Sequence, residues 1–142
     1  MSTPTDRPVV DGDRALAAVT HGARLAAEQS ARVTICVVDR AGVIASYRHH
    51  DAVTASLDLA AAKARAAAGL AKPSGDIGAG VVPGAPFYGL AAALSSPIAT
   101  FDGGFPIVVD GHCCGAVGVS GASSAADVQI AQAALAAYHD AG

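Results

Sequence analysis

The densest polar cluster of the 142-residue chain is the run Arg48-His49-His50-Asp51. A histidine beside a carboxylate and a guanidinium could act as a general acid or base near neutral pH. The same imidazole could instead be an axial ligand of heme iron. A third interpretation is a set of exposed ion pairs at a corner of the fold, which needs no function. We take His49, His50 and Asp51 as candidate catalytic residues and Arg48 as a candidate ligand-binding residue.

The orientation of the two histidines depends on the backbone around them. The pair follows an apolar run that reads as a strand, and side chains alternate between the two faces of a strand. If the strand continues through the pair, His49 and His50 diverge. The sequence then predicts that only one of them enters a pocket.

A second candidate is Lys63, one of only two lysines in the chain. It lies on the near-apolar side of an alanine-rich segment that is predicted to be helical. Lys63 could face a cavity and bind a substrate carboxylate. The alternative is a surface lysine whose aliphatic stem covers apolar surface.

Aromatic side chains are few, and Phe87, Tyr88 and Phe101 make up half of the three Phe and three Tyr residues. The first two lie in a glycine- and proline-rich loop over residues 72–89, and such long loops are often functional. Phe87 and Phe101 could cover an apolar ligand as a lid. They could equally close the edge of the core.

The stretch from Asp102 to Gly121 is rich in glycine and contains two further candidates. Gly103 and Gly104 could present backbone N–H groups to an anion, because glycine permits close approach. No Gly-Lys-Ser/Thr run follows, so the stretch is no phosphate-binding loop of the common type.

The same stretch predicts a β-hairpin, because Asp110-Gly111 suits a type I′ turn between two apolar runs. Its arms are expected over residues 105–109 and 112–120. Small residues would share one face of the second arm, and these are Cys114, Ala116, Gly118 and Ser120. A face without bulk lets a helix, another subunit or a flat ligand come close, and in the last case Ser120 would line the ligand.

The adjacent His112-Cys113-Cys114 resembles a metal tripod, but we predict no metal site here. Consecutive strand residues alternate faces, whereas zinc ligands are typically spaced as in Cys-x-x-Cys. Three cysteines, an odd number, fit reduced thiols better than a disulfide framework.

These residues are positioned by elements that the hydrophobic pattern outlines. Helices are expected over about 13–30, 54–71 and 124–139, and strands over 32–39, 43–48 and 98–101 besides the hairpin. Strands joined by a short turn must be antiparallel. The sequence therefore predicts an α+β fold with about five largely antiparallel strands and helices packed on them. Residues 1–12 are expected to be a loose arm, and residues 13–142 a single domain.

Composition narrows the possible partners. Hydrophobic residues make up 52% of the chain and charged residues only 15%, which favours self-association into a homo-oligomer. The net charge of -3 offers no basic surface for nucleic acid. No apolar run reaches the roughly 18 residues of a membrane span, and the first residues are too polar for a signal peptide. We expect a cytoplasmic protein with a small-molecule partner.

Four segments in this order resemble the GlcG/HbpS family of heme-binding-like domains, which also occur at the end of PduO-type proteins. They are VVDRAG (37–42), the cluster at 48–52 with its following Ser/Ala/Lys helix, GGFPI (103–107) and GAVGVSGAS (115–123) with Asp127. The resemblance implies a profilin-like fold and assembly into dimers or larger closed oligomers. It also implies binding of heme or a related tetrapyrrole in some members. Family members typically read Arg-Met-Asp-Gly-Ala where this chain has two histidines, which suggests a specialised pocket.

Two functions remain open at this point. The first is a small-ligand binding protein for heme or a related tetrapyrrole, heme being the one cofactor expected. The second is a cofactor-independent enzyme of the isomerase, lyase or cyclase type. In that enzyme His49 or His50 would transfer the proton while Arg48 or Lys63 would hold an anionic group.

Overall fold

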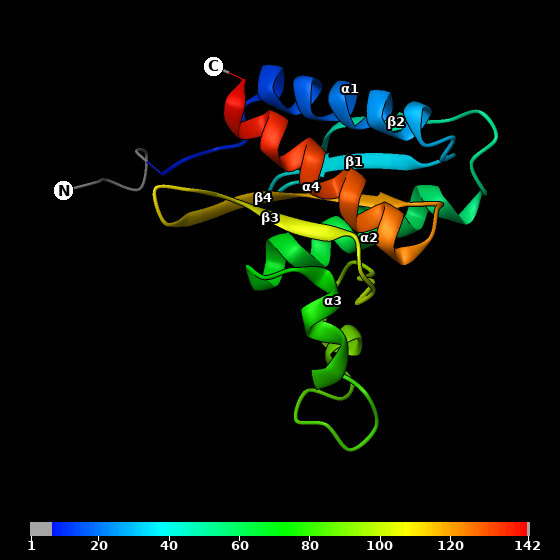
Figure 1. The fold of residues 1–142 in the computed structure, drawn as a ribbon. Helices are drawn as coiled ribbons and strands as arrows, with labels where there is room; N and C mark the ends of the chain where they lie inside the picture. Colours follow the sequence, from blue (N-terminus) through cyan, green and yellow to red (C-terminus); the bar gives the residue numbers. More distant parts are fainter. Residues whose placement is uncertain (1–6, 142) are drawn as a thin grey trace.

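The computed structural model describes residues 7–141, which form a four-stranded antiparallel sheet covered by helices on both faces (Figure 1). The strands lie in the order β2-β1-β4-β3. The elements in chain order are α1 (Gly12–Glu28), β1 (Thr34–Val38), β2 (Val43–Arg48), α2 (Ala55–Leu70), the one-turn α3 (Ser74–Ile77), the 3-10 turns η2 (Gly78–Gly80) and η3 (Leu90–Ala93), β3 (Gly104–Val109), β4 (His112–Ser120) and α4 (Ser124–Asp140). The α+β prediction with an antiparallel sheet is confirmed.

The helices divide the molecule into layers. In Figure 1, α1 and α4 lie side by side on one face of the sheet, α2 covers the other face, and the segment from α3 to residue 101 projects away from the body. The larger core lies between the sheet and the α1/α4 pair, and a smaller alanine-rich core lies under α2. Central strand β1 is buried along its whole length, with Ile35 and Val37 in the first core and Cys36 in the second.

The prediction of five strands is wrong, because residues 98–101 do not join the sheet. The backbone of this segment bonds to α2 instead. The Ala99 N–H donates to the carbonyl of Ala62 at 3.2 Å, and Arg65 Nε donates to the carbonyl of Pro97 at 3.1 Å. The edge of the sheet therefore remains β3.

The predicted hairpin is present, and Asp110 (φ 51°) and Gly111 (φ 77°) both have the positive φ that a type I′ turn requires. One detail of its second arm was not predicted. The register shifts between Ile107 and Val108 of β3, so that β4 carries one extra residue, Cys114, and bulges at this point.

The bulge changes which face each cysteine occupies. Cys114 packs in the larger core rather than with Ala116, and Cys113 lies beside α2 with its Sγ 3.6 Å from the carbonyl of Ala68. The expected grouping of Cys114 with the small residues is therefore wrong. All three cysteines are free.

The remaining small residues of β4 lie against helix α2, as one of the sequence interpretations required. A Cβ on Gly118 would collide with the carbonyl oxygen of Ala60 and lie 2.8 Å from the backbone nitrogen of Ala64. Helix α2 thus approaches the strand backbone more closely than any side chain at position 118 allows.

The chain start is part of this body from about residue 10. Val10 is buried in the larger core, and Asp11 caps α1 by accepting a hydrogen bond from the Arg14 N–H at 2.9 Å. Residues 1–6 of the predicted arm lie outside the described residues. None of the helices in the described part of the chain has the length and apolar character needed to cross a bilayer.

Candidate functional site

The two histidines lie where edge strand β2 ends and the chain turns toward α2. The His49 N–H still bonds to the carbonyl of Val33 at 3.0 Å, and the Ala52 N–H then closes a turn on the His49 carbonyl at 3.0 Å. Because the turn begins immediately after His49, strand alternation stops there. The expectation that the two rings diverge is wrong.

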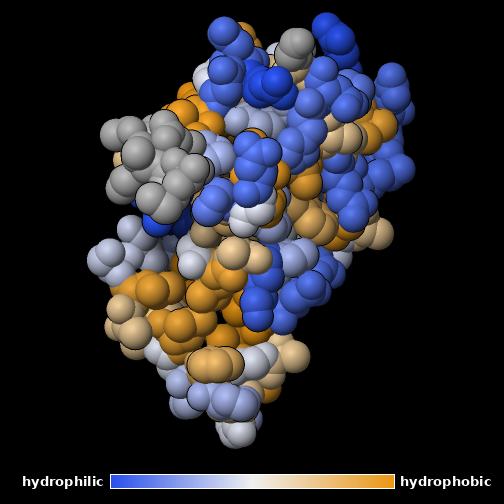
Figure 2. Space-filling model, turned by 90° about the vertical axis from the view of Figure 1, so that its left-hand side faces the viewer, coloured by the Kyte–Doolittle hydropathy of each residue, from blue (hydrophilic) through white to orange (hydrophobic). Residues whose placement is uncertain are grey.

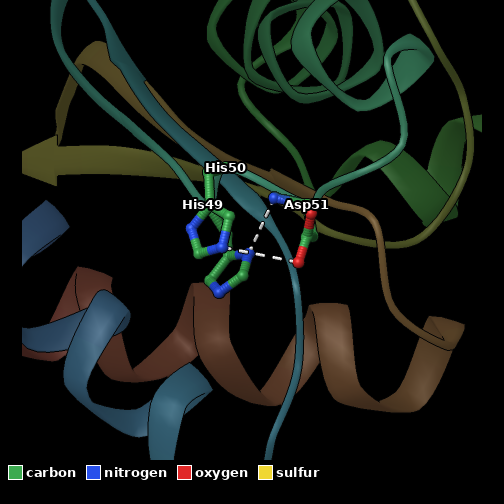
Figure 3. Close-up of side chains that lie close together, drawn as sticks. All are labelled: His49, His50 and Asp51. Atoms are coloured by element: carbon green, nitrogen blue, oxygen red, sulfur yellow. Dashed lines mark hydrogen bonds and ion pairs between the residues drawn. The ribbon is translucent and has the colours of Figure 1, made fainter.

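Instead the rings of His49 and His50 stack, with centroids 4.2 Å apart and an interplanar angle of 26° (Figure 3). Asp51 contacts both: its N–H donates to His49 Nδ1 at 3.0 Å, and its Oδ2 lies 3.4 Å from His50 Nε2. Because His49 Nδ1 accepts this hydrogen bond, the neutral His49 ring carries its proton on Nε2. His50 has no such constraint, since its side chain is 83% exposed.

A hollow of about 380 Å³ lies beside this pair. Its walls come from the end of α1, the segment before β1, and β2, and they consist of Ala27, Ser30, Ala31, Arg32, Tyr47, His49, His50 and Asp51. The lining thus combines apolar alanines with the cationic Arg32 and the imidazoles of His49 and His50. Three of the four residues in the predicted cluster line this hollow, and Arg48 precedes them at the exposed end of β2.

The same three residues could also approach a metal ion. One ligand atom each from His49, His50 and Asp51 lies within 4.8 Å of the other two. His49 is half-buried and the other two are exposed, so the groups are accessible from solvent.

Lys63 does not join the histidines. It is buried, and its Nζ donates to the carbonyl of Val119 at 2.9 Å and to Asp127 Oδ2 at 3.2 Å. The other carboxylate oxygen of Asp127 accepts the N–H of Ala122 at 3.0 Å. The ammonium thus connects α2 to the start of α4 and lines none of the hollows described in this chain.

Burial shapes the electrostatics of this pair. Desolvation raises the pKa of Asp127 above its ordinary value, while the Ala122 N–H and the Lys63 ammonium act in the opposite direction. In the sequence, Asp127 stands out only with the family-like segments, and its pairing with Lys63 was not predicted. The one sequence feature that could have indicated a role for Asp127 was its position shortly after the GAVGVSGAS segment of the family resemblance.

The paired glycines serve the same contact between α2 and the sheet. Gly104 donates its N–H to Ser74 Oγ at 2.8 Å, and a Cβ there would lie 2.8 Å from the carbonyl carbon of Lys63. Both Gly103 and Gly104 are buried, so their backbone groups do not face an open anion site. Ser120 is also buried, paired with Thr34 across β1 and β4.

The two aromatic candidates lie on the projecting segment. Phe87 is 66% exposed and Phe101 is 59% exposed, and neither lines the hollow beside the histidines. The structure therefore brings together His49, His50 and Asp51 but separates them from Lys63, Phe87, Phe101, the glycine pair and Ser120.

Comparison with known proteins connects this architecture to one family. The family model described as "Haem degrading protein HbpS-like" matches residues 10–136. The corrinoid adenosyltransferase PduO of Salmonella typhimurium is 36% identical over 108 residues, which are 75% of this chain and 32% of that protein. The chain thus spans about a third of the length of that relative.

Two solved structures extend the match to the fold. Klebsiella pneumoniae protein ORFY superposes with a TM-score of 0.90 at 28% identity, covering 100% of this chain and 99% of that one. A structure titled as a PduOC:heme complex gives a TM-score of 0.85 at 30% identity, covering 92% of this chain and 95% of that one. The resemblance seen in the sequence motifs is confirmed, and the chain belongs to the HbpS-like family.

Proposed function

We propose that this protein binds heme or a related tetrapyrrole at the histidine corner, which we define as His49, His50 and Asp51 with the hollow that they line. The observation that carries the proposal is the stacked His49/His50 pair at the mouth of a hollow with an apolar wall. The relative at 30% identity whose structure is titled as a heme complex supports it. These comparisons do not favour the alternative of a cofactor-independent enzyme.

The residues around the hollow fit the chemistry of such a ligand. Ala27, Ala31 and Tyr47 offer apolar contact to a flat ring, and Arg32 offers a cation to a carboxylate substituent. A volume of about 380 Å³ is near the lower end of the usual range for ligand pockets, about 300–1,000 Å³. Because a tetrapyrrole is large and flat, we infer that one edge enters the hollow while the rest stays outside it.

His50 is the better candidate for the iron ligand. His49 Nδ1 accepts the Asp51 N–H, which leaves the proton on Nε2 and no lone pair there for iron. The His50 side chain is 83% exposed, so a ligand can reach it from solvent. His49 would then position His50 by stacking against it, and His50 would hold the iron that bound heme supplies.

A heme titration tests the proposal. We expect a Soret band on titration of the wild-type protein, a loss or shift of that band in His50→Ala, and affinity lowered by about tenfold, which corresponds to about 1.4 kcal/mol. His21→Ala, which removes an exposed histidine on α1, is the matched control and should behave as wild type. A wild-type protein without spectral change does not bind heme. A band that survives both His49→Ala and His50→Ala places heme elsewhere on the molecule.

We also infer that the protein assembles into a homo-oligomer and that the projecting segment carries the contact. Large apolar side chains are exposed along it, namely Val82, Phe87, Tyr88, Leu94 and Phe101. Figure 2 shows hydrophobic surface gathered on this segment, below a more hydrophilic body. Such a patch is typical of a surface that a partner covers. The cytoplasmic location stays a prediction.

A further inference from the structure

A second hollow, of about 330 Å³, lies at the other end of β2 from the histidine corner and on the α2 side of the sheet. Four parts of the chain meet around it: the turn after β1, the second half of α2, the loop before residue 99 and the bulged start of β4. Its lining residues are Asp39, Arg40, Arg65, Ala68, Gly69, Leu94, Ser95, Ser96, Ile98, Cys113 and Cys114. The two hollows border opposite ends of β2, and these ends are roughly 16 Å apart, given the strand rise of about 3.3 Å per residue.

Two arginines from different elements line this hollow. Arg40 is exposed on the β1–β2 turn, and half-buried Arg65 uses Nε to bond the carbonyl of Pro97 at 3.1 Å, which leaves its terminal nitrogens available. Within residues 7–141, neither arginine has a carboxylate within 4.0 Å. Two arginines that have no acidic partner among the described residues therefore line one concave site.

The single carboxylate in the lining does not neutralise them directly. Asp39 Oδ1 accepts the N–H groups of Ala41 at 2.7 Å and Gly42 at 2.9 Å, so it is held in its own turn. One carboxylate against two guanidinium groups leaves the lining with an excess of positive charge. Ser95 and Ser96 add hydroxyl groups that can donate hydrogen bonds.

Each of the two arginines also acts on the pKa of a cysteine thiol in the sheet. Burial raises the pKa of Cys36 to about 11, and Arg65 acts against this increase. Burial and the neighbouring Cys113 raise the pKa of Cys114, and Arg40 acts against that increase. Arg65 and Arg40 each therefore oppose the increase in the pKa of one of these thiols.

We propose that this second hollow binds a small organic anion through a carboxylate or phosphate group held by Arg40 and Arg65. Guanidinium pairs oxyanions bidentately, and two guanidinium groups from separate elements fix both the position and the orientation of the group. The apolar part of the ligand would contact Ala68, Leu94 and Ile98. The site needs no heme and is independent of the histidine corner.

Calorimetric titration of the full-length protein with inorganic phosphate and, separately, malonate tests the proposal. Glycerol serves as the uncharged comparison. We expect binding of at least one anion and none of glycerol. Phosphate alone identifies a phosphate site, and malonate alone identifies a carboxylate site. Absence of binding by both anions overturns the proposal.

Three substitutions locate the anion. Arg40→Gln should raise the dissociation constant by about tenfold or more, whereas Arg24→Gln, the same change on exposed α1, should leave it unchanged. Asp39→Asn keeps an oxygen that can accept both turn hydrogen bonds but removes the opposing charge, so it should tighten binding several-fold. If Arg24→Gln weakens binding as much as Arg40→Gln, the affinity depends only on the net charge of the protein, and the proposed location of the anion is wrong. Weaker binding in Asp39→Asn contradicts the proposal too.

Discussion

At the scale of single residues, the clearest feature is the buried ion pair between Lys63 and Asp127. Their side chains are each 5% exposed, and every polar atom of the pair has a protein partner. Breaking one side of a buried pair costs more than replacing both sides, because the remaining charge stays buried without compensation. The pair therefore stabilises this arrangement of α2 and α4 only while both members are present.

Lys63→Met should lower the free energy of unfolding by about 3–5 kcal/mol, and adding Asp127→Asn should recover part of this loss. The loss should also depend on pH. Burial already raises the pKa of Asp127, and removal of Lys63 removes a group that lowers it, so the pKa rises further. The folded variant then keeps a proton that the unfolded chain releases, and its stability falls as pH increases above the ordinary pKa of 3.8.

Urea denaturation of the wild type and both variants at about pH 5 and about pH 8 measures this effect. The deficit of Lys63→Met should be smaller at the lower pH. Equal deficits at both values, or a double variant as unstable as the sum of the single changes, would show that the two charges do not act as a pair.

At the scale of elements, the contact between α2 and the sheet depends on small residues on both sides. Alanines of α2 meet β4 at Gly118, and Gly104 of β3 meets the backbone of α2 near Lys63. Close backbone approach leaves no space for a side chain. This contact sets the position of α2, which supplies Arg65, Ala68 and Gly69 to the lining of the second hollow.

Gly118→Ala should therefore lower the free energy of unfolding by about 3 kcal/mol or more, because the strand and the helix must move apart. Gly69→Ala is the matched control. It lies in α2 with open space around its Cβ position, and it should stabilise the protein by about 0.5–1 kcal/mol through helix propensity. Thermal or urea denaturation compares the two. A tolerated Gly118→Ala would mean that α2 does not lie as close to β4 as described.

At the scale of the whole molecule, the apolar projecting segment is unlike the compact body. A chain with 15% charged residues has few polar groups to cover its surface, and the largest exposed aromatics gather on this one segment. A second copy of the chain, with the same segment, is the occupant that composition favours.

Phe87→Asp and Phe101→Asp should therefore shift the protein toward the mass of one chain, 13.8 kDa, in light scattering after size exclusion. Leu16→Asp places the same charge on exposed α1 at the far side of the sheet and should leave the assembly intact. A wild-type protein that is already a single chain would contradict the homo-oligomer. Dissociation by Leu16→Asp alone would move the contact to α1.

The amino-acid sequence by itself determined the features that depend on near neighbours. The Asp110-Gly111 turn, the buried strand β1 and the small face at Gly118 follow from backbone preferences and from residue size, which act within a few residues. The motifs that indicated the family are of the same local kind.

Only the tertiary structure decided where side chains meet. Lys63 and Asp127 are 64 residues apart, and their pairing depends on how α2 and α4 are placed around the sheet. The stacked histidines result from a turn that His49 begins, directly after the strand predicted over residues 43–48. Residues 98–101 have a sequence typical of a strand, but they bond to helices instead, through the Ala99 N–H to α2 and the Phe101 carbonyl to Ser74 of α3. In each case a long-range contact selected among conformations that local preferences left open.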